Sequence, residues 1–271
     1  MSDNRPIGVF DSGLGGLTVV RELKRLLPNE NIVYFGDTGR VPYGTRSNDI
    51  VRKYAREDEA FLLSQNVKMI IAACGTVSSV AYMTAKELPV PFLEVVTPAA
   101  KAACDATKNG RIGVIGTPVT VKSRSHARAI LRILPDSLIV ANSCPLFVPL
   151  VEEGWISADD SVTTCVAERY LAPLKEGEVD TLIMGCTHYP ALRQTIAKVM
   201  GEEVTLIDPG TATAEMVKEH LEQNDMLNQG GGECKYFVSD RPDAFSKTAE
   251  ILMGESIENG VEQVDIFKYI G

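Results

Sequence analysis

The sequence predicts an α/β protein made of two similar three-layer domains with mainly parallel sheets. Three observations support this prediction. Short apolar runs rich in β-branched residues alternate with longer segments of helical periodicity, which is typical of a parallel sheet covered by helices on both faces. Several of these runs match one another at a displacement of 105 or 112 positions. The composition, 45% hydrophobic and 23% charged over 271 residues, excludes disordered and collagen-like chains.

The expected elements follow from the periodicity of apolar residues. Strands are expected where short apolar runs are bounded by turn residues, at Ile7–Phe10, Ile32–Phe35, Val67–Ala73, Phe92–Val96, Arg111–Ile115, Leu138–Ala141, Asp180–Met184, Val204–Ile207 and Tyr236–Val238. Helices are expected where apolar residues recur every three or four positions, at Leu17–Leu27, Ile50–Leu63, Ser79–Leu88, Val162–Leu174 and Ala214–Leu221. The glycine-rich stretch Asn224–Glu233 is expected to be an exposed connection.

The internal repeat places two cysteines at equivalent points. Val67–Cys74 and Val179–Cys186 are both apolar strands that end in a small residue and then cysteine, and the cysteines are 112 positions apart. Ile7–Phe10 and Ile112–Ile115 match at a displacement of 105. Chance similarity between apolar strands is the alternative explanation. In open α/β sheets ligands bind at the carboxyl ends of strands, so a pseudo-twofold pair of domains would let both cysteines face one cleft.

Composition excludes several classes of function. With 27 Lys and Arg against 36 Asp and Glu, the net charge of −9 argues against a protein that binds nucleic acid through a broad basic face. The chain shows no signal peptide and no apolar run of the roughly 18 residues that a membrane span needs. We therefore expect a cytoplasmic protein whose thiols stay reduced, with no membrane partner.

Of the six cysteines, Cys74 and Cys186 are the candidates for chemistry. Each is expected in a strand-to-helix turn, where exposed backbone N–H groups favour a thiolate or a bound carboxylate. The remaining four lack this context and are expected to be packing residues, with less certainty for the one that precedes a proline: Cys104, Cys144, Cys165 and Cys234. A lone cysteine in an apolar strand is itself most often a packing residue.

Further polar residues lie near the same strand ends. Asp11 and Ser12 follow the first strand, and His188 stands two residues after Cys186, where it could polarise the thiol. The plainer interpretations are a turn for the first pair and a surface position for the histidine. The glycines after Ser12 do not form a dinucleotide-binding pattern, because position 18 is Thr18. No spacing of His or Cys residues indicates a metal site.

Four motifs together resemble bacterial glutamate racemase. They begin at Ile7, Gly36, Ala73 and Gly185, and they read IGVFDSGLGGLTV, GDT followed by PYG, AC, and GCTHYP. They occur in the family's order over nearly the whole chain. The paired cysteines alone would also fit the wider aspartate/glutamate racemase superfamily.

The resemblance implies a racemase that needs neither pyridoxal phosphate nor a metal. Inverting an amino acid requires removal of the weakly acidic Cα proton and its return on the opposite face, hence two acid/base groups. By resemblance these are Cys74, thought to act on the D-enantiomer, and Cys186, thought to act on the L-enantiomer. Asp11 and His188 would assist the thiols, and Glu152 would be an auxiliary carboxylate.

The resemblance also implies the residues that contact the substrate. They are Asp11, Ser12, Pro42, Tyr43, Gly44, Gly75, Thr76, Thr117, Thr120, Thr187 and His188. One of them departs from the family pattern, since the family usually has Asn where this chain has Gly75. The missing amide puts substrate affinity in doubt, and to a lesser degree the choice of amino acid.

The family pattern and the repeat together predict a discontinuous first domain of residues 1–96 plus 208–271 and a second domain of residues 97–207. D- or L-glutamate is the expected substrate, and D-glutamate for peptidoglycan the expected product. A homodimer is also expected. The alternatives are a sibling racemase for aspartate or another acidic substrate, a non-catalytic binding protein, and a thiol redox protein.

Overall fold

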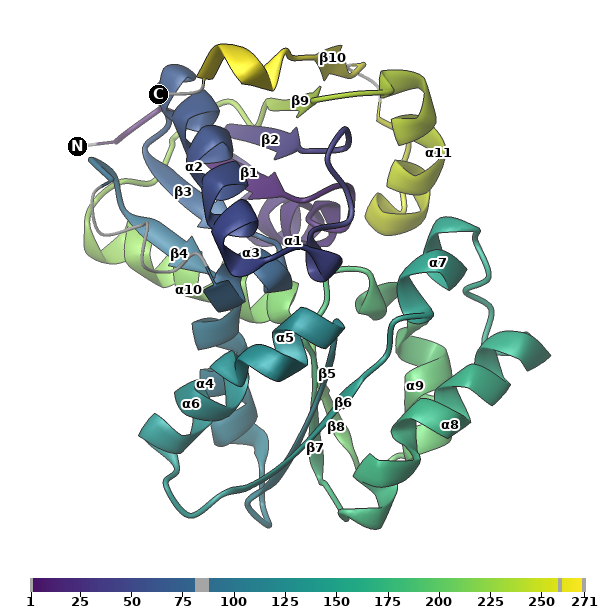
Figure 1. Ribbon diagram of the computed structural model, residues 1–271. Helices are drawn as coiled ribbons and strands as arrows, with labels where there is room; N and C mark the ends of the chain where they lie inside the picture. The colour runs from purple at the N-terminus through teal and green to yellow at the C-terminus, as the bar shows by residue number, and fades with distance from the viewer. Residues whose placement is uncertain (1, 81–87, 258–259, 270–271) are drawn as a thin grey trace.

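The computed structural model describes residues 2–80, 88–257 and 260–269, which form two parallel β-sheets (Figure 1). The larger sheet has the strand order β10-β9-β2-β1-β3-β4 and the smaller one β6-β5-β7-β8, and all neighbouring strands pair in parallel. The strands are β1 Ile7–Asp11, β2 Ile32–Gly36, β3 Met69–Ala72, β4 Phe92–Glu94, β5 Arg111–Gly116, β6 Leu138–Ser143, β7 Thr181–Met184, β8 Thr205–Ile207, β9 Cys234–Val238 and β10 Glu262–Gln263.

The two sheets share one topology, as the internal repeat predicts. The order β2-β1-β3-β4 in the larger sheet is repeated as β6-β5-β7-β8 in the smaller one. Cys74 follows β3 and Cys186 follows β7, so the cysteines occupy the same place in the two sheets. The chain passes to the smaller sheet after β4 and returns to the larger one after β8.

Helices cover both faces of each sheet, which confirms the predicted α/β class with two domains. The α-helices are α1 Leu17–Leu26, α2 Asn48–Ser64, α3 Gly75–Val80, α4 Val96–Ala106, α5 Pro118–Ser123, α6 Ser125–Ile133, α7 Phe147–Glu152, α8 Ser161–Glu176, α9 Arg193–Met200, α10 Pro209–Gln223 and α11 Pro242–Met253. Short 3₁₀ turns lie at η1 Tyr43–Thr45, η3 Tyr189–Leu192 and η4 Ile266–Tyr269. In the larger domain α1 packs on α10 and α11, while α2 packs on the opposite face with η4. In the smaller domain α4 and α6 lie on one face, and α8 and α9 on the other.

The structure corrects one strand prediction. The expected strand Phe92–Val96 ends at Glu94, and α4 begins at Val96. The reason is the buried Glu94 carboxylate, which accepts hydrogen bonds from the backbone N–H groups of Val96 at 2.5 Å and Thr97 at 2.9 Å and so caps the new helix. The expected helix Ser79–Leu88 lies mostly outside the described residues. The connection at Asn224–Glu233 is confirmed between α10 and β9.

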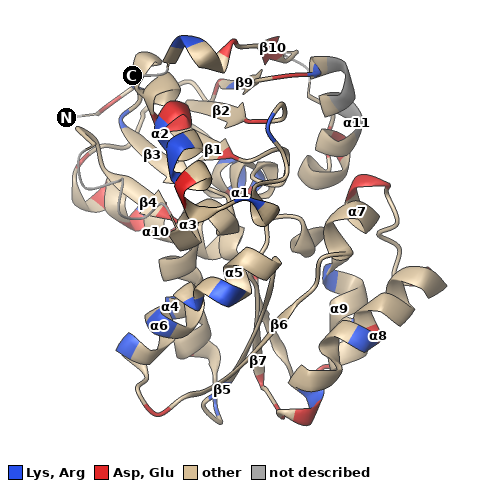
Figure 2. Cartoon of the chain, in the orientation of Figure 1, with Lys and Arg blue, Asp and Glu red and all other residues tan. Residues whose placement is uncertain are grey.

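The largest of the three buried apolar clusters of the described residues contains residues of both domains. It contains Val9 of β1 and Leu182 and Met184 of β7, all fully buried. Acidic and basic residues are interspersed over both domains (Figure 2). In the described part of the chain no helix is long and apolar enough to cross a membrane. The domain limits inferred from the sequence stay a prediction, although the strands fall in the two sheets as those limits require.

Candidate active site

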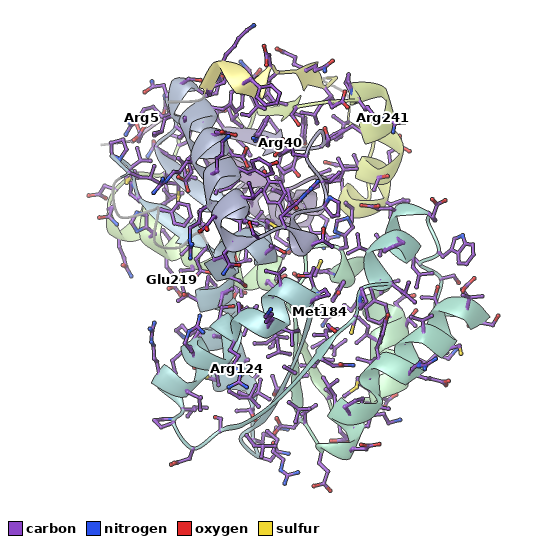
Figure 3. All side chains as sticks on the ribbon, viewed as in Figure 1. Arg5, Arg40, Arg124, Met184, Glu219 and Arg241 are labelled. Carbon is purple, nitrogen blue, oxygen red and sulfur yellow. The ribbon has the colours of Figure 1, made fainter. Side chains whose placement is uncertain are left out.

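A cavity of about 380 Å³ lies between the carboxyl ends of the two sheets. Figure 3 labels Met184, the last residue of β7, where the smaller domain faces the larger one. Both candidate cysteines and nearly all the predicted contact residues line this cavity: Ser12, Pro42, Tyr43, Gly44, Cys74, Gly75, Thr76, Thr117, Thr120, Glu152, Cys186, Thr187 and His188. Residues far apart in the sequence therefore meet at one place.

Cys74 forms one wall of the cavity. It lies between β3 and α3, is 5% exposed, and its Sγ lies 3.4 Å from Ser12 Oγ as a hydrogen-bond donor. Burial, followed by the negative charge of Asp11, raises the pKa of this thiol to about 12. Near neutral pH the thiol form of Cys74 is therefore favoured, and a positively charged ligand group beside it would favour the thiolate.

Asp11 lies behind Cys74 and does not itself line the cavity. It ends β1, is 1% exposed, and its Oδ2 accepts a hydrogen bond of 3.1 Å from the backbone N–H of Gly13. Burial raises the pKa of this carboxyl, against the opposing effect of the His188 charge. Asp11 thus lies against Cys74, and its contact with the substrate and its assistance to the thiol stay predictions.

The opposite wall carries Cys186, His188 and Glu152. His188 Nε2 lies 3.2 Å from Glu152 Oε1, an ion-pair distance without hydrogen-bond geometry. Burial alone would lower the pKa of His188, but its hydrogen bond to the Cys186 side chain and its contact with Glu152 raise it to about 10. The imidazolium form of His188 is therefore favoured next to the Cys186 side chain.

Threonine hydroxyls close the space between the two walls. Thr76 Oγ1 of the larger domain lies 3.3 Å from Thr117 Oγ1 of the smaller one, which in turn lies 3.0 Å from Thr120 Oγ1. Among the described residues that line the cavity none is Lys or Arg. An anionic ligand would therefore depend on hydroxyl groups, backbone N–H groups and His188.

Tyr43 lines the cavity but its hydroxyl is not free. The side chain is fully buried, and its hydroxyl donates to the buried carboxylates of Asp37 and Asp58. Arg40 also binds both carboxylates, Asp37 at 2.6 Å and Asp58 at 3.0 Å. This network holds the Pro42–Gly44 loop and uses the hydrogen of the Tyr43 hydroxyl.

Several lining residues escaped the sequence analysis, and most are apolar: Gly13, Leu14, Val41, Thr45, Pro118, Pro145, Val148, Pro149 and Gly185. The sequence feature that could have predicted part of this lining is the run from Pro145 to Pro149, which has a proline at each end. Cys104, Cys144 and Cys234 are buried as expected, but the prediction for Cys165 is wrong, because α8 turns it to the solvent. The described residues contain no group of three or more His, Cys, Asp or Glu side chains that could hold a metal ion.

Comparison with known proteins identifies the class. Residues 7–217 match the Asp/Glu/Hydantoin racemase family. The glutamate racemase of Syntrophus aciditrophicus is 45% identical over 264 residues, covering 96% of this chain and 97% of that protein. The chain therefore belongs to the Asp/Glu/Hydantoin racemase family. It is a racemase, an enzyme of the isomerase class.

Solved structures agree with this assignment. The glutamate racemase of Francisella tularensis in complex with D-glutamate superimposes with a TM-score of 0.91 at 38% identity, covering 98% of this chain and 100% of the other. The Thermus thermophilus glutamate racemase in complex with beta-chloro-D-alanine has a TM-score of 0.89 at 44% identity, covering 99% and 100%. The fold and the class thus rest on sequence and structure together.

Proposed function

We propose that this chain is a glutamate racemase that interconverts L- and D-glutamate by proton transfer between Cα and two thiols. The observation that supports this proposal best is the placement of Cys74 and Cys186. They come from equivalent strand ends of two domains and line one cavity. Each has its own polar neighbour, Asp11 on one side and His188 on the other.

The proposed chemistry transfers one proton in each step. The Cys74 thiolate takes the Cα proton of D-glutamate, so that the Cα–H bond breaks, an S–H bond forms, and the electron pair stays on Cα and its carboxylate. The Cys186 thiol then gives its proton to the opposite face and becomes a thiolate. The L-enantiomer reacts in the reverse direction. The ammonium group of the substrate would favour the thiolate form of Cys74, which burial of this side chain disfavours.

Glutamate is proposed as the substrate because relatives that match almost the full chain carry that name. The second candidate is a racemase for aspartate or another acidic substrate. Gly75 is the observation that favours it, because the resemblance predicts an amide side chain there. The hydroxyls of Thr76, Thr117 and Thr120 would bind a side-chain carboxylate in either case.

The resemblance supports the remaining parts of the proposal. No cofactor would be needed, because the two thiols supply both proton transfers. The product would be D-glutamate for peptidoglycan, made in the cytoplasm. A homodimer is the proposed assembly, with no nucleic acid or membrane as a partner.

The test is a racemisation assay by circular dichroism with purified protein and no added cofactor. We expect L-glutamate to lose its optical activity, and Cys74→Ser and Cys186→Ser each to lower the rate by about 10²-fold or more, because each removes one acid/base group. Cys234→Ser, a buried cysteine outside the cavity, is the matched control. Activity on aspartate alone would favour the second candidate. Near-normal rates in either active-site variant would exclude the two-thiol mechanism.

A further inference from the structure

A hydrogen bond between the two domains ends on the turn that carries Cys186. Thr18 lies in the first turn of α1 in the larger domain and is 1% exposed. Its Oγ1 donates a hydrogen bond of 3.1 Å to the backbone oxygen of Thr187, which directly follows Cys186 in the smaller domain. A threonine that lies outside the cavity lining is therefore in direct contact with the turn that places the second thiol.

The Thr187 carbonyl depends on this donor. In a helical turn a carbonyl accepts from the N–H group three or four residues later. The residue three positions later is Pro190, which has no N–H, and the N–H of Ala191 donates to the His188 carbonyl at 3.1 Å. Because Thr187 is only 7% exposed, a carbonyl left without a donor there would be costly. The partner that the proline removes is thus replaced by a hydroxyl from the other domain.

The Thr18 hydroxyl has a second carbonyl within reach, that of Gly15. Its Oγ1 lies 2.9 Å from the Gly15 backbone oxygen, which also accepts from the Thr18 backbone N–H at 3.1 Å. A carbonyl oxygen has two lone pairs and can accept both. Loss of the hydroxyl would therefore leave Gly15 with a donor but would take from Thr187 the donor that it has.

We propose that Thr18 is a positioning residue that holds the Cys186 turn against the larger domain. The inference rests on the proposed two-thiol function and deepens it. The loop that leads into α1 also carries Ser12, whose Oγ accepts from the Cys74 thiol at 3.4 Å. One short segment thus contacts Cys74 near its beginning and the Cys186 turn near its end. Since α1 packs on α10 and α11, this segment is a firm support for the turn.

Loss of the hydroxyl should affect the two thiols unequally, because Cys74 keeps its contact with Ser12 while the Cys186 turn loses its support. With D-glutamate, the Cys74 thiolate still breaks the Cα–H bond and becomes a thiol, whose hydrogen exchanges with solvent. A misplaced Cys186 protonates the opposite face slowly, so the carbanion takes a hydrogen back from Cys74 and D-glutamate forms again. In D₂O this cycle places deuterium at Cα without inversion.

L-Glutamate gives a different expectation. Its Cα proton is removed by Cys186 itself, so a misplaced Cys186 slows the first step, on which exchange and inversion both depend. Cys74, which keeps its place, then completes the inversion. The ratio of exchange to inversion therefore rises for D-glutamate and does not rise for L-glutamate. A loss of folded protein alone would change neither ratio.

The experiment compares the unaltered protein in D₂O with Thr18→Val, which keeps the shape of threonine and lacks the hydroxyl. Inversion is followed by circular dichroism from each enantiomer, and deuterium at Cα of the remaining substrate is measured by mass spectrometry after chiral separation. We expect kcat for inversion to fall about 10-fold. The ratio of exchange to inversion should rise severalfold from D-glutamate and should not rise from L-glutamate.

Two control variants separate the hydroxyl bond between domains from general effects of substitution. Thr18→Ser keeps the hydroxyl and should retain the kcat and both ratios of the unaltered protein. Thr213→Val removes another fully buried hydroxyl, whose Oγ1 donates to the Pro209 carbonyl at 2.6 Å within α10. This second variant should lower Tm and leave both ratios unchanged.

The outcomes that would overturn the proposal are distinct from failure of the proposed function. A Thr18→Val protein whose ratio from D-glutamate does not rise would overturn the role of Thr18, whatever its kcat. A ratio that rises from L-glutamate, or an equal change in Thr18→Ser, would overturn it as well. If Thr18→Val does not fold, Thr18→Ala is measured instead, and failure of both to fold would show that Thr18 serves folding and not position. Absence of racemisation in the unaltered protein would refute the proposed function and this inference with it.

Discussion

His126 gives the protein a measurable sensitivity to acid. It lies on α6, is 3% exposed, and neither ring nitrogen has a hydrogen-bond partner among the described residues. Its ring packs beneath the end of β7, since a Cβ atom on Gly185 would lie 3.2 Å from His126 Cε1. Burial lowers the pKa of His126 from 6.5 to about 4.

The sign of the effect follows from which state binds the proton first. As the pH falls below 6.5, the unfolded chain takes up a proton at this histidine and the folded chain does not, so the free energy of unfolding decreases until the pH reaches about 4. Between about pH 7.5 and about pH 5.5 the loss from this one group is about 1.3 kcal/mol. Below about pH 4 it approaches about 3 kcal/mol.

The assay is urea unfolding of the unaltered protein and of His126→Phe at these two pH values. Phe fills a similar volume and does not titrate, so the stability of the variant relative to the unaltered protein should improve by about 1.3 kcal/mol at the lower pH. Ile130→Val, on the same helix and fully buried, is the control, and its cost of about 1 kcal/mol should be the same at both pH values. A relative stability of His126→Phe that does not change with pH would refute this reasoning.

Two further predictions concern ion pairs. Lys68 and Glu30 are buried and their charged groups lie 2.6 Å apart, so Lys68→Met should lower the free energy of unfolding by about 3–5 kcal/mol in urea titrations. Adding Glu30→Gln should restore most of this stability, because it removes the carboxylate left without its partner. A loss that the second change does not restore would contradict an unpaired charge as the cause. Glu152→Gln removes a contact that raises the pKa of His188, so the alkaline limb of the pH–rate profile should move to lower pH. An unmoved limb would show that Glu152 does not influence this imidazole.

Local patterns predict most of the fold but not its interruptions. The strands of both sheets could be predicted because buried parallel strands are continuous apolar runs. The apolar run at Phe92–Val96 misled the analysis because its break depends on a side-chain cap by Glu94, not on hydrophobicity. Helix α4 was missed for a related reason, since its first residue, Val96, was assigned to the preceding strand.

The sequence likewise predicts part of the candidate site and misses the part that depends on contacts between distant segments. Cys74, Cys186 and the residues beside them could be predicted because each cysteine is flanked by residues typical of a strand end and a turn. The network of Asp37, Arg40 and Asp58 beneath the Tyr43 loop could not, because it joins segments whose contacts depend on the folded chain. The hydrogen bond from Thr18 to Thr187 likewise depends on how two domains meet, which no local pattern records.

The return of the chain to the larger sheet determines the order in which the protein can form during synthesis. The smaller sheet uses only residues 111–207, so all of its strands have emerged before α10 is complete. The larger sheet must wait for β9, whose residues Cys234–Val238 pair with β2 about 200 positions earlier. Until then β2 has an open edge in the nascent chain. The larger sheet therefore contains the first strands to be synthesised but is completed last. The smaller sheet, whose strands come from the middle of the chain, is the first that can be completed.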